Sequence, residues 1–275
     1  MKQILVASDF SQSASDATVY ALSLAKALKM EVAVLHAIHP TEGINNNTYN
    51  AIFIEEYYSR KRKALQEWVD GLVTDELRQV KVKAVCDVGS LRTVINRHVE
   101  YHNVSFLVMG ITGATGITGI VGSNTSMAVS KLRIPTLIVP QGTKLPAAPV
   151  ITLATDYKTT KLSIRDIKAM KQLMKIAAGH RLEALHVTED DTDPKDLEHE
   201  EKRLQSIIPS ADFHFNYING DEKTSKEIID FIKGNQTDIL CLVKRNHNII
   251  YSLFGDGTVS AILNKSVNAV LILHE

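Results

Sequence analysis

Short apolar runs alternate with longer segments of helical period along the chain. Runs such as Ile4–Ala7 and Val104–Met109 are almost continuously apolar, as strands are when helices cover both faces of a parallel sheet. Between the runs of the first half, apolar residues recur with a helical period over residues 13–28, 52–77, 91–102 and 123–132. The order βαβαβαβαβ predicts an α/β fold with a five-stranded, doubly wound parallel sheet.

The second half of the chain repeats the first. Ile4–Asp9 recurs as Ile151–Asp156, and each is an apolar run that ends in a small residue, a hydroxyl residue and aspartate. Val32–Ala37 recurs in the same order as Leu182–Val187. This internal similarity indicates a duplicated domain.

A connector rich in proline and alanine, Gly142–Val150, separates the two repeats. A chain of 275 residues is long enough for two domains that each bury a core. We therefore expect two tandem Rossmann-like domains, residues 1–144 and 145–275, each with about four helices around its sheet.

Composition and charge favour a cytoplasmic protein. Lysine plus arginine equals aspartate plus glutamate, at 31 each, so no global field favours nucleic acid or an anionic membrane. The apolar stretch at the N-terminus is too short for a signal peptide, and no apolar run reaches the length of about 18 residues that a membrane span needs. Cys86 and Cys241 lie in apolar runs, as buried thiols of a reducing compartment do.

The segment Met109–Thr125 leaves a strand and enters a helix with glycine at every third position from Gly110 to Gly122. Glycines let backbone amides approach a ligand closely, and the helix that begins near Ser123 adds free N–H donors and the positive end of its dipole. Such a segment, at the carboxyl ends of parallel strands, predicts a phosphate site. The alternative is a flexible strand-to-helix loop without a ligand.

Two other phosphate motifs are excluded. A P-loop requires Gly-Lys-Ser/Thr at the helix entry, where this chain has Gly122-Ser123-Asn124. A dinucleotide fingerprint requires Gly-x-Gly-x-x-Gly after the first strand, which here leads into Asp9-Phe10-Ser11.

The glycine segment resembles the nucleotide motif of the universal stress protein family, whose ATP-binding members carry Gly-x-x-Gly, nine residues and then Gly-Ser/Thr. Gly110-Ile111-Thr112-Gly113 and Gly122-Ser123 match this motif with a spacer of eight residues, Ala114–Val121. The resemblance covers the whole chain, twice. It implies binding of ATP, with Mg²⁺ on the phosphates, more securely than hydrolysis.

The resemblance also implies which residues form the site. Asp9 would face the adenine and ribose end of the nucleotide, Ala37 would contact adenine, and Met109 would line the site. The expected nucleotide-binding residues are Asp9, Ala37, Met109, Gly110, Gly113, Gly122, Ser123, Asn124 and Thr125. For Asp9 the alternative is a purely structural role as the cap of the first helix.

The second half departs from the motif. Lys244 and His247 stand where the first two motif glycines are expected, although Gly257-Thr258 keeps the helix entry. The side chains of Lys244 and His247 would either fill the phosphate cradle or bind a smaller anion. We therefore expect the nucleotide site mainly in the first half.

No catalytic or metal-binding residue is predicted. His36 and His186 end matching strands and are interpreted as packed residues that satisfy backbone groups. The preferred function is regulation or sensing in the stress response through bound nucleotide. The alternatives are a scaffold that binds no nucleotide and a slow ATPase.

The resemblance favours an intramolecular pseudo-dimer of the two halves. Family dimers associate through the last strand, and an unpaired apolar edge strand is a liability. Thr136–Pro140 and Ala269–His274 are therefore candidates to pair with each other. Two chains could associate further into a homodimer.

Overall fold

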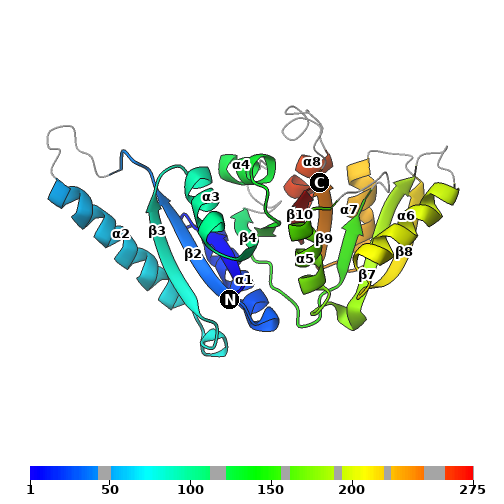
Figure 1. Cartoon of the computed structure of the whole chain (residues 1–275), viewed down its shortest axis with the longest axis horizontal. Helices are drawn as coiled ribbons and strands as arrows, with labels where there is room; N and C mark the ends of the chain where they lie inside the picture. Colours follow the sequence, from blue (N-terminus) through cyan, green and yellow to red (C-terminus); the bar gives the residue numbers. More distant parts are fainter. Residues whose placement is uncertain are drawn as a thin grey trace.

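The protein consists of two α/β halves that share one ten-stranded sheet, with helices on both faces (Figure 1). The computed structural model describes residues 1–42, 51–111, 122–155, 162–188, 194–219, 224–244 and 258–274.

Each half alternates strands and helices as the apolar pattern predicts. The first half contains β1 (Gln3–Ala7), α1 (Gln12–Leu28), β2 (Glu31–Ile38), α2 (Ala51–Leu72), β3 (Val82–Val88), α3 (Leu91–Tyr101), β4 (Val104–Ile111), α4 (Ser123–Lys131) and β5 (Thr136–Pro140). The second half contains β6 (Ile151–Ala154), α5 (Ile164–Leu173), β7 (Arg181–Thr188), α6 (Pro194–Ile207), β8 (Asp212–Asn219), α7 (Thr224–Gly234), β9 (Ile239–Lys244), α8 (Thr258–Lys265) and β10 (Ala269–His274).

The strand order is β3-β2-β1-β4-β5-β10-β9-β6-β7-β8. Neighbouring strands within each half are parallel, so the predicted five-stranded, doubly wound domains are confirmed. At the centre, β5 and β10 pair antiparallel, with Ile138 opposite Val270. The last strands of the two halves are therefore neighbours in one sheet.

Two apolar layers hold the helices to the sheet. On one face, α1 buries Ala21 beside β1 and β4, and α2 buries Leu65 beside β2 and β3. Helices α5 and α6 contribute to the same apolar layer in the second half. On the other face, α3 and α4 bury Val94 and Ala128 against the opposite side of the same strands. Because strand side chains alternate between faces, nearly every strand residue must be apolar.

One predicted helix is shorter than expected. The pattern over residues 52–77 predicts a single helix, whereas α2 ends at Leu72 and a separate short 3-10 turn covers Asp75–Leu77. Between them lie the β-branched residues Val73 and Thr74, which are weaker helix formers, and Thr74 is extended, with ψ of 165°.

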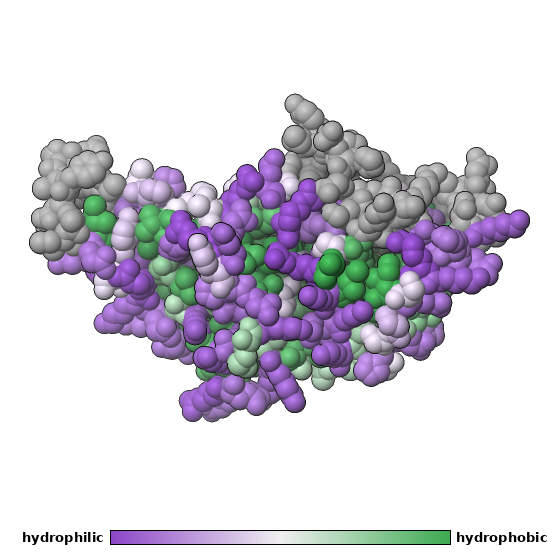
Figure 2. Space-filling model, viewed as in Figure 1, coloured by the Kyte–Doolittle hydropathy of each residue, from purple (hydrophilic) through white to green (hydrophobic). Residues whose placement is uncertain are grey.

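The outer faces of the helices are mostly polar. Figure 2 shows hydrophilic side chains over much of the visible face, with apolar residues between them. None of the described helices combines the length and the apolar character that crossing a membrane requires.

Candidate functional site

A cavity of about 510 Å³ opens beside the carboxyl ends of β1, β2 and β4. Its volume falls within the range of small-molecule sites, roughly 300–1,000 Å³. Because the strand order runs 3-2-1-4-5, the chain reverses its direction of winding between β1 and β4. Open α/β sheets bind their ligands at such a switch point.

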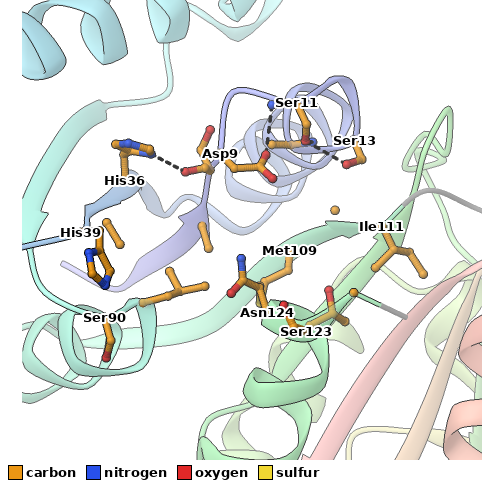
Figure 3. Close-up of a pocket in the computed structure, with 18 of the residues that line it drawn as sticks. Asp9, Ser11, Ser13, His36, His39, Ser90, Met109, Ile111, Ser123 and Asn124 are labelled. Carbon is orange, nitrogen blue, oxygen red and sulfur yellow. Dashed lines mark hydrogen bonds between the residues drawn. The ribbon is translucent and has the colours of Figure 1, made fainter. Parts of the chain in front are cut away.

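The predicted site residues come together at this cavity (Figure 3). Figure 3 shows Asp9 on one side, and Ser123 and Asn124 on the other. The expected residues that line it are Asp9, Ala37, Met109, Gly110, Gly122, Ser123, Asn124 and Thr125. Gly113 lies outside the described residues.

Asp9 is held by the tight turn between β1 and α1. Its Oδ1 accepts a hydrogen bond of 3.0 Å from the amide of Ser11. Ser11 is the N-cap of α1, because its hydroxyl accepts from the amide of Ala14 at 3.2 Å. The alternative of Asp9 as the helix cap is therefore wrong, and its exposed carboxylate faces the cavity. Phe10, between Asp9 and Ser11, adopts a left-handed backbone conformation with φ of 66°. This conformation is uncommon for a residue other than glycine.

Gly110 allows β4 and α1 to approach each other closely. A Cβ atom at this position would lie 2.1 Å from the carbonyl oxygen of Ser13. Any other residue would force the two backbones apart, and so would displace both walls of the cavity. The first motif glycine is thus required by packing in the protein itself.

Three helices begin at the cavity, and α4 differs from the other two at its N-terminus. The N-caps of α1 and α3, Ser11 and Ser90, accept hydrogen bonds from their own helices through their hydroxyl groups. The N-cap of α4 is Gly122, which provides no such acceptor, and a Cβ atom there would meet nothing within 4 Å. The first amides of α4 therefore have no cap from the side chain of their own N-cap residue, and an anion at this end would be stabilised by N–H donors and the helix dipole.

The described residues that line the cavity include no lysine or arginine that could pair with an anion. Asp9 is the one carboxylate among them. Residues 112–121, which the structure does not describe, contain no lysine or arginine in the sequence. The described residues also contain no group of three potential metal ligands. A highly charged ligand would thus need a cation that it brings with it.

His36 packs as expected, but it also lines the cavity. Its Nδ1 donates to the carbonyl oxygen of Ser8 at 2.9 Å, and its ring lies 4.7 Å from that of Phe10. The sequence interpretation missed His36, His39 and Ser90 as lining residues. Their positions in the sequence could have identified them, since each lies near the carboxyl end of a predicted strand or at the start of a predicted helix.

The second half keeps part of this arrangement. His186 Nδ1 lies 3.0 Å from the carbonyl oxygen of Thr155, as His36 does from Ser8. Asp156, His247 and Gly257 lie outside the described residues, and Thr258 begins α8.

The strand registers show that Lys244 does not occupy the position of the first motif glycine, contrary to the prediction from the sequence. Ile4 pairs with Phe106, and its repeat Ile151 pairs with Ile239. Counting four residues on from each partner aligns Gly110 with Val243, so Lys244 corresponds to Ile111. Before Phe106, β4 carries one extra residue, where its register with β1 shifts between Gln3 and Ile4.

Lys244 also takes neither of its two expected roles. Its ammonium group donates to the carbonyl oxygens of Val129 and Ser130, each at 3.0 Å. Both acceptors belong to α4 of the other half.

Comparisons with known proteins agree with this architecture. A model described as the universal stress protein family matches residues 1–140. A universal stress protein from Archaeoglobus fulgidus DSM 4304 is similar over 98% of this chain and 97% of its own, with a TM-score of 0.78 and 20% identity. A functionally unknown protein from Pseudomonas aeruginosa PAO1 is similar over 99% of this chain and 92% of its own, with a TM-score of 0.56 and 14% identity. No curated protein sequence matches the chain.

Proposed function

Because the chain belongs to the universal stress protein family, we propose that it is an ATP-binding protein that regulates or senses in the stress response. The nucleotide site is the cavity of the first half. The adenine and ribose would lie toward Asp9 and Ala37, and the phosphates toward Gly122 and Ser123.

One observation carries this proposal: the uncapped N-terminus of α4 opens into the cavity opposite Asp9. Backbone amides at such a terminus bind phosphate oxygens, and the hydroxyl groups of Ser123 and Thr125 add donors. The close approach at Gly110 fixes β4 against α1, so the two ends of the site keep a constant separation.

Mg²⁺ is part of the proposal, because the described lining residues include no lysine or arginine for the phosphates. The metal would arrive on the nucleotide and offset its charge. Removal of Mg²⁺ should therefore weaken ATP binding more than it would in a site that contains lysine or arginine.

The second half is proposed to bind no nucleotide and to serve as the partner in a pseudo-dimer. Val243 occupies the position that corresponds to Gly110, and Lys244 is engaged by α4. Residues 1–144 and 145–275 remain our proposed domain limits. A cytoplasmic location is also part of the proposal, consistent with the free thiols of Cys86 and Cys241. Pairing of two chains into a homodimer stays a prediction.

The test is calorimetric titration of nucleotide-free protein with ATP, with and without Mg²⁺. We expect one site per chain, and binding that is weaker by about tenfold or more in Gly122→Val, because the new side chain would occupy the space in front of the α4 amides. Gly234→Val at the end of α7 is the matched control, since a Cβ atom there also meets nothing within 4 Å.

Trp68, the single tryptophan of the chain, provides a second readout. Its ring lies 5.7 Å from that of Phe10, which follows Asp9 directly. Absence of both heat and fluorescence change, with no ligand retained on purification, would favour the scaffold alternative. Turnover that Gly122→Val abolishes would favour the slow ATPase, and two sites per chain would contradict the proposed role of the second half.

A further inference from the structure

Lys244 connects the second half to the helix that begins at the proposed nucleotide site. It is the last residue of β9, and its ammonium group donates to the carbonyl oxygens of Val129 and Ser130, each at 3.0 Å. These carbonyls lie in the last turn of α4, where helix carbonyls have no partner within the helix. A cation at this end also complements the helix dipole. A residue of one half thus caps a helix of the other.

The antiparallel junction explains how Lys244 reaches α4. Because β5 and β10 run in opposite directions, the carboxyl ends of β9 and β10 lie beside the start of β5. Helix α4 ends directly before β5, at Lys131. His274 of β10 is in register with Lys244 and is also buried beside this turn. The contact therefore depends on how the two halves are joined.

The surroundings of Lys244 make it an unfavourable place for a positive charge. Burial, and then the nearby Arg133 and Lys131, lower the pKa of the Lys244 ammonium group. Burial also lowers the pKa of His274 to about 4, with Lys244 and Arg133 as further causes, so that imidazole is neutral at physiological pH. Within the described parts of the chain, no carboxylate pairs with Lys244.

A half-buried cation without a counterion does not by itself stabilise a fold. What Lys244 does provide is a fixed position for one end of α4. The helix has nine residues, which corresponds to about 14 Å, and a helix this short is marginal without tertiary contacts. Its other end carries Ser123, Asn124 and Thr125 at the cavity.

We infer that Lys244 is a positioning residue for the nucleotide site of the first half: it anchors the C-terminal end of α4 and so aligns the N-terminal amides with the phosphates. The inference rests on the proposed function. It gives the second half a specific role, because the first half's site is then complete only when β9 of the second half lies against α4. By linkage, bound nucleotide should strengthen this contact in return.

The experiment compares full-length variants by titration with ATP and Mg²⁺ and by amide hydrogen exchange without nucleotide. Lys244→Met leaves an unbranched side chain that is one atom shorter and has no donors. We expect it to weaken ATP binding by roughly three- to tenfold and to speed amide exchange within residues 123–131. Lys244→Arg should restore both properties, because a guanidinium group can donate to the same carbonyls.

Lys233→Met is the matched control, since Lys233 is an exposed lysine near the end of α7 in the same half. It should change neither quantity. Should Lys244→Met fail to fold, Lys244→Gln can replace it, because glutamine retains one neutral donor group. The ATP affinity of Lys244→Gln should lie between the affinity of the wild type and that of Gly122→Val.

Three outcomes would overturn the inference. If Lys244→Met is less stable but binds ATP as the wild type does, Lys244 only ties the halves together. If exchange in α4 is unchanged, the helix is not anchored by this residue. If the wild type itself binds no nucleotide, the proposed function is wrong and the inference falls with it. The titration of the wild type alone shows this, without any variant.

Discussion

At the scale of single residues, Gly110 couples the stability of the fold to the shape of the site. A Cβ atom there would lie 2.1 Å from a backbone oxygen of α1, which cannot rotate away as a side chain would. We expect Gly110→Ala to lower the free energy of unfolding by about 1–3 kcal/mol, as overpacking does, and to weaken ATP binding as well. Urea denaturation and calorimetric titration measure the two effects.

Gly71→Ala is the matched control for this change. Gly71 lies on the exposed side of α2, where a Cβ atom meets nothing within 4 Å. Alanine is the better helix former, so this variant should gain up to about 1 kcal/mol in unfolding free energy. If both variants shifted stability in the same direction, a tight contact between β4 and α1 would be disproved.

At the scale of secondary structure elements, the free N-terminus of α4 implies that capping and ligand binding compete. Gly122→Asp would supply the missing acceptor, and a carboxylate at this end favours the helix dipole. We expect it to stabilise the protein by about 0.5–1 kcal/mol and to weaken ATP binding by about tenfold or more, because the carboxylate takes the amides and repels phosphate. Thermal unfolding and ATP titration should therefore change in opposite directions.

Gly122→Asn separates the two causes. Asparagine caps a helix about as well as aspartate does but carries no charge. Its gain in stability should be smaller than that of Gly122→Asp, because it lacks the contribution of a negative charge at the helix dipole, and its loss of ATP affinity should be smaller too. A variant with an aspartate cap that still bound ATP as tightly as the wild type would show that the phosphates lie elsewhere.

Strands with a continuous apolar run and helices with a clear apolar period were predictable from the sequence. A sheet covered on both faces requires apolar strands, and a helix that covers it requires one apolar face. The glycine segment and Asp9 also led to the cavity, because strand ends meet at one edge of a parallel sheet. The position of Lys244 was not predictable. Its contact with α4 depends on the antiparallel junction of β5 and β10, which is set by contacts between distant parts of the chain.

At the scale of the whole molecule, the junction between β5 and β10 makes the two halves parts of one core. Leu137 and Leu271 pair across it and are almost fully buried, and the same apolar cluster extends from α1 of the first half to α6 of the second. Since both last strands are used in this junction, a homodimer of the chain would have to form through another surface.

A shared core predicts that the two halves unfold together, and Trp68 makes this testable because it reports on the first half alone. Leu204 lies in α6 of the second half and is 1% exposed, so Leu204→Ala should lower the free energy of unfolding by about 2–5 kcal/mol. If the molecule unfolds cooperatively, Leu204→Ala lowers the urea midpoint measured by Trp68 fluorescence and the midpoint measured by circular dichroism by the same amount. Leu24→Ala in α1 should also lower both midpoints together. If the halves unfold independently, Leu204→Ala leaves the Trp68 midpoint unchanged and splits the dichroism transition in two. That result would mean that Lys244 and the β5–β10 pairing are only local contacts. The second half could then not influence the nucleotide site through cooperative unfolding.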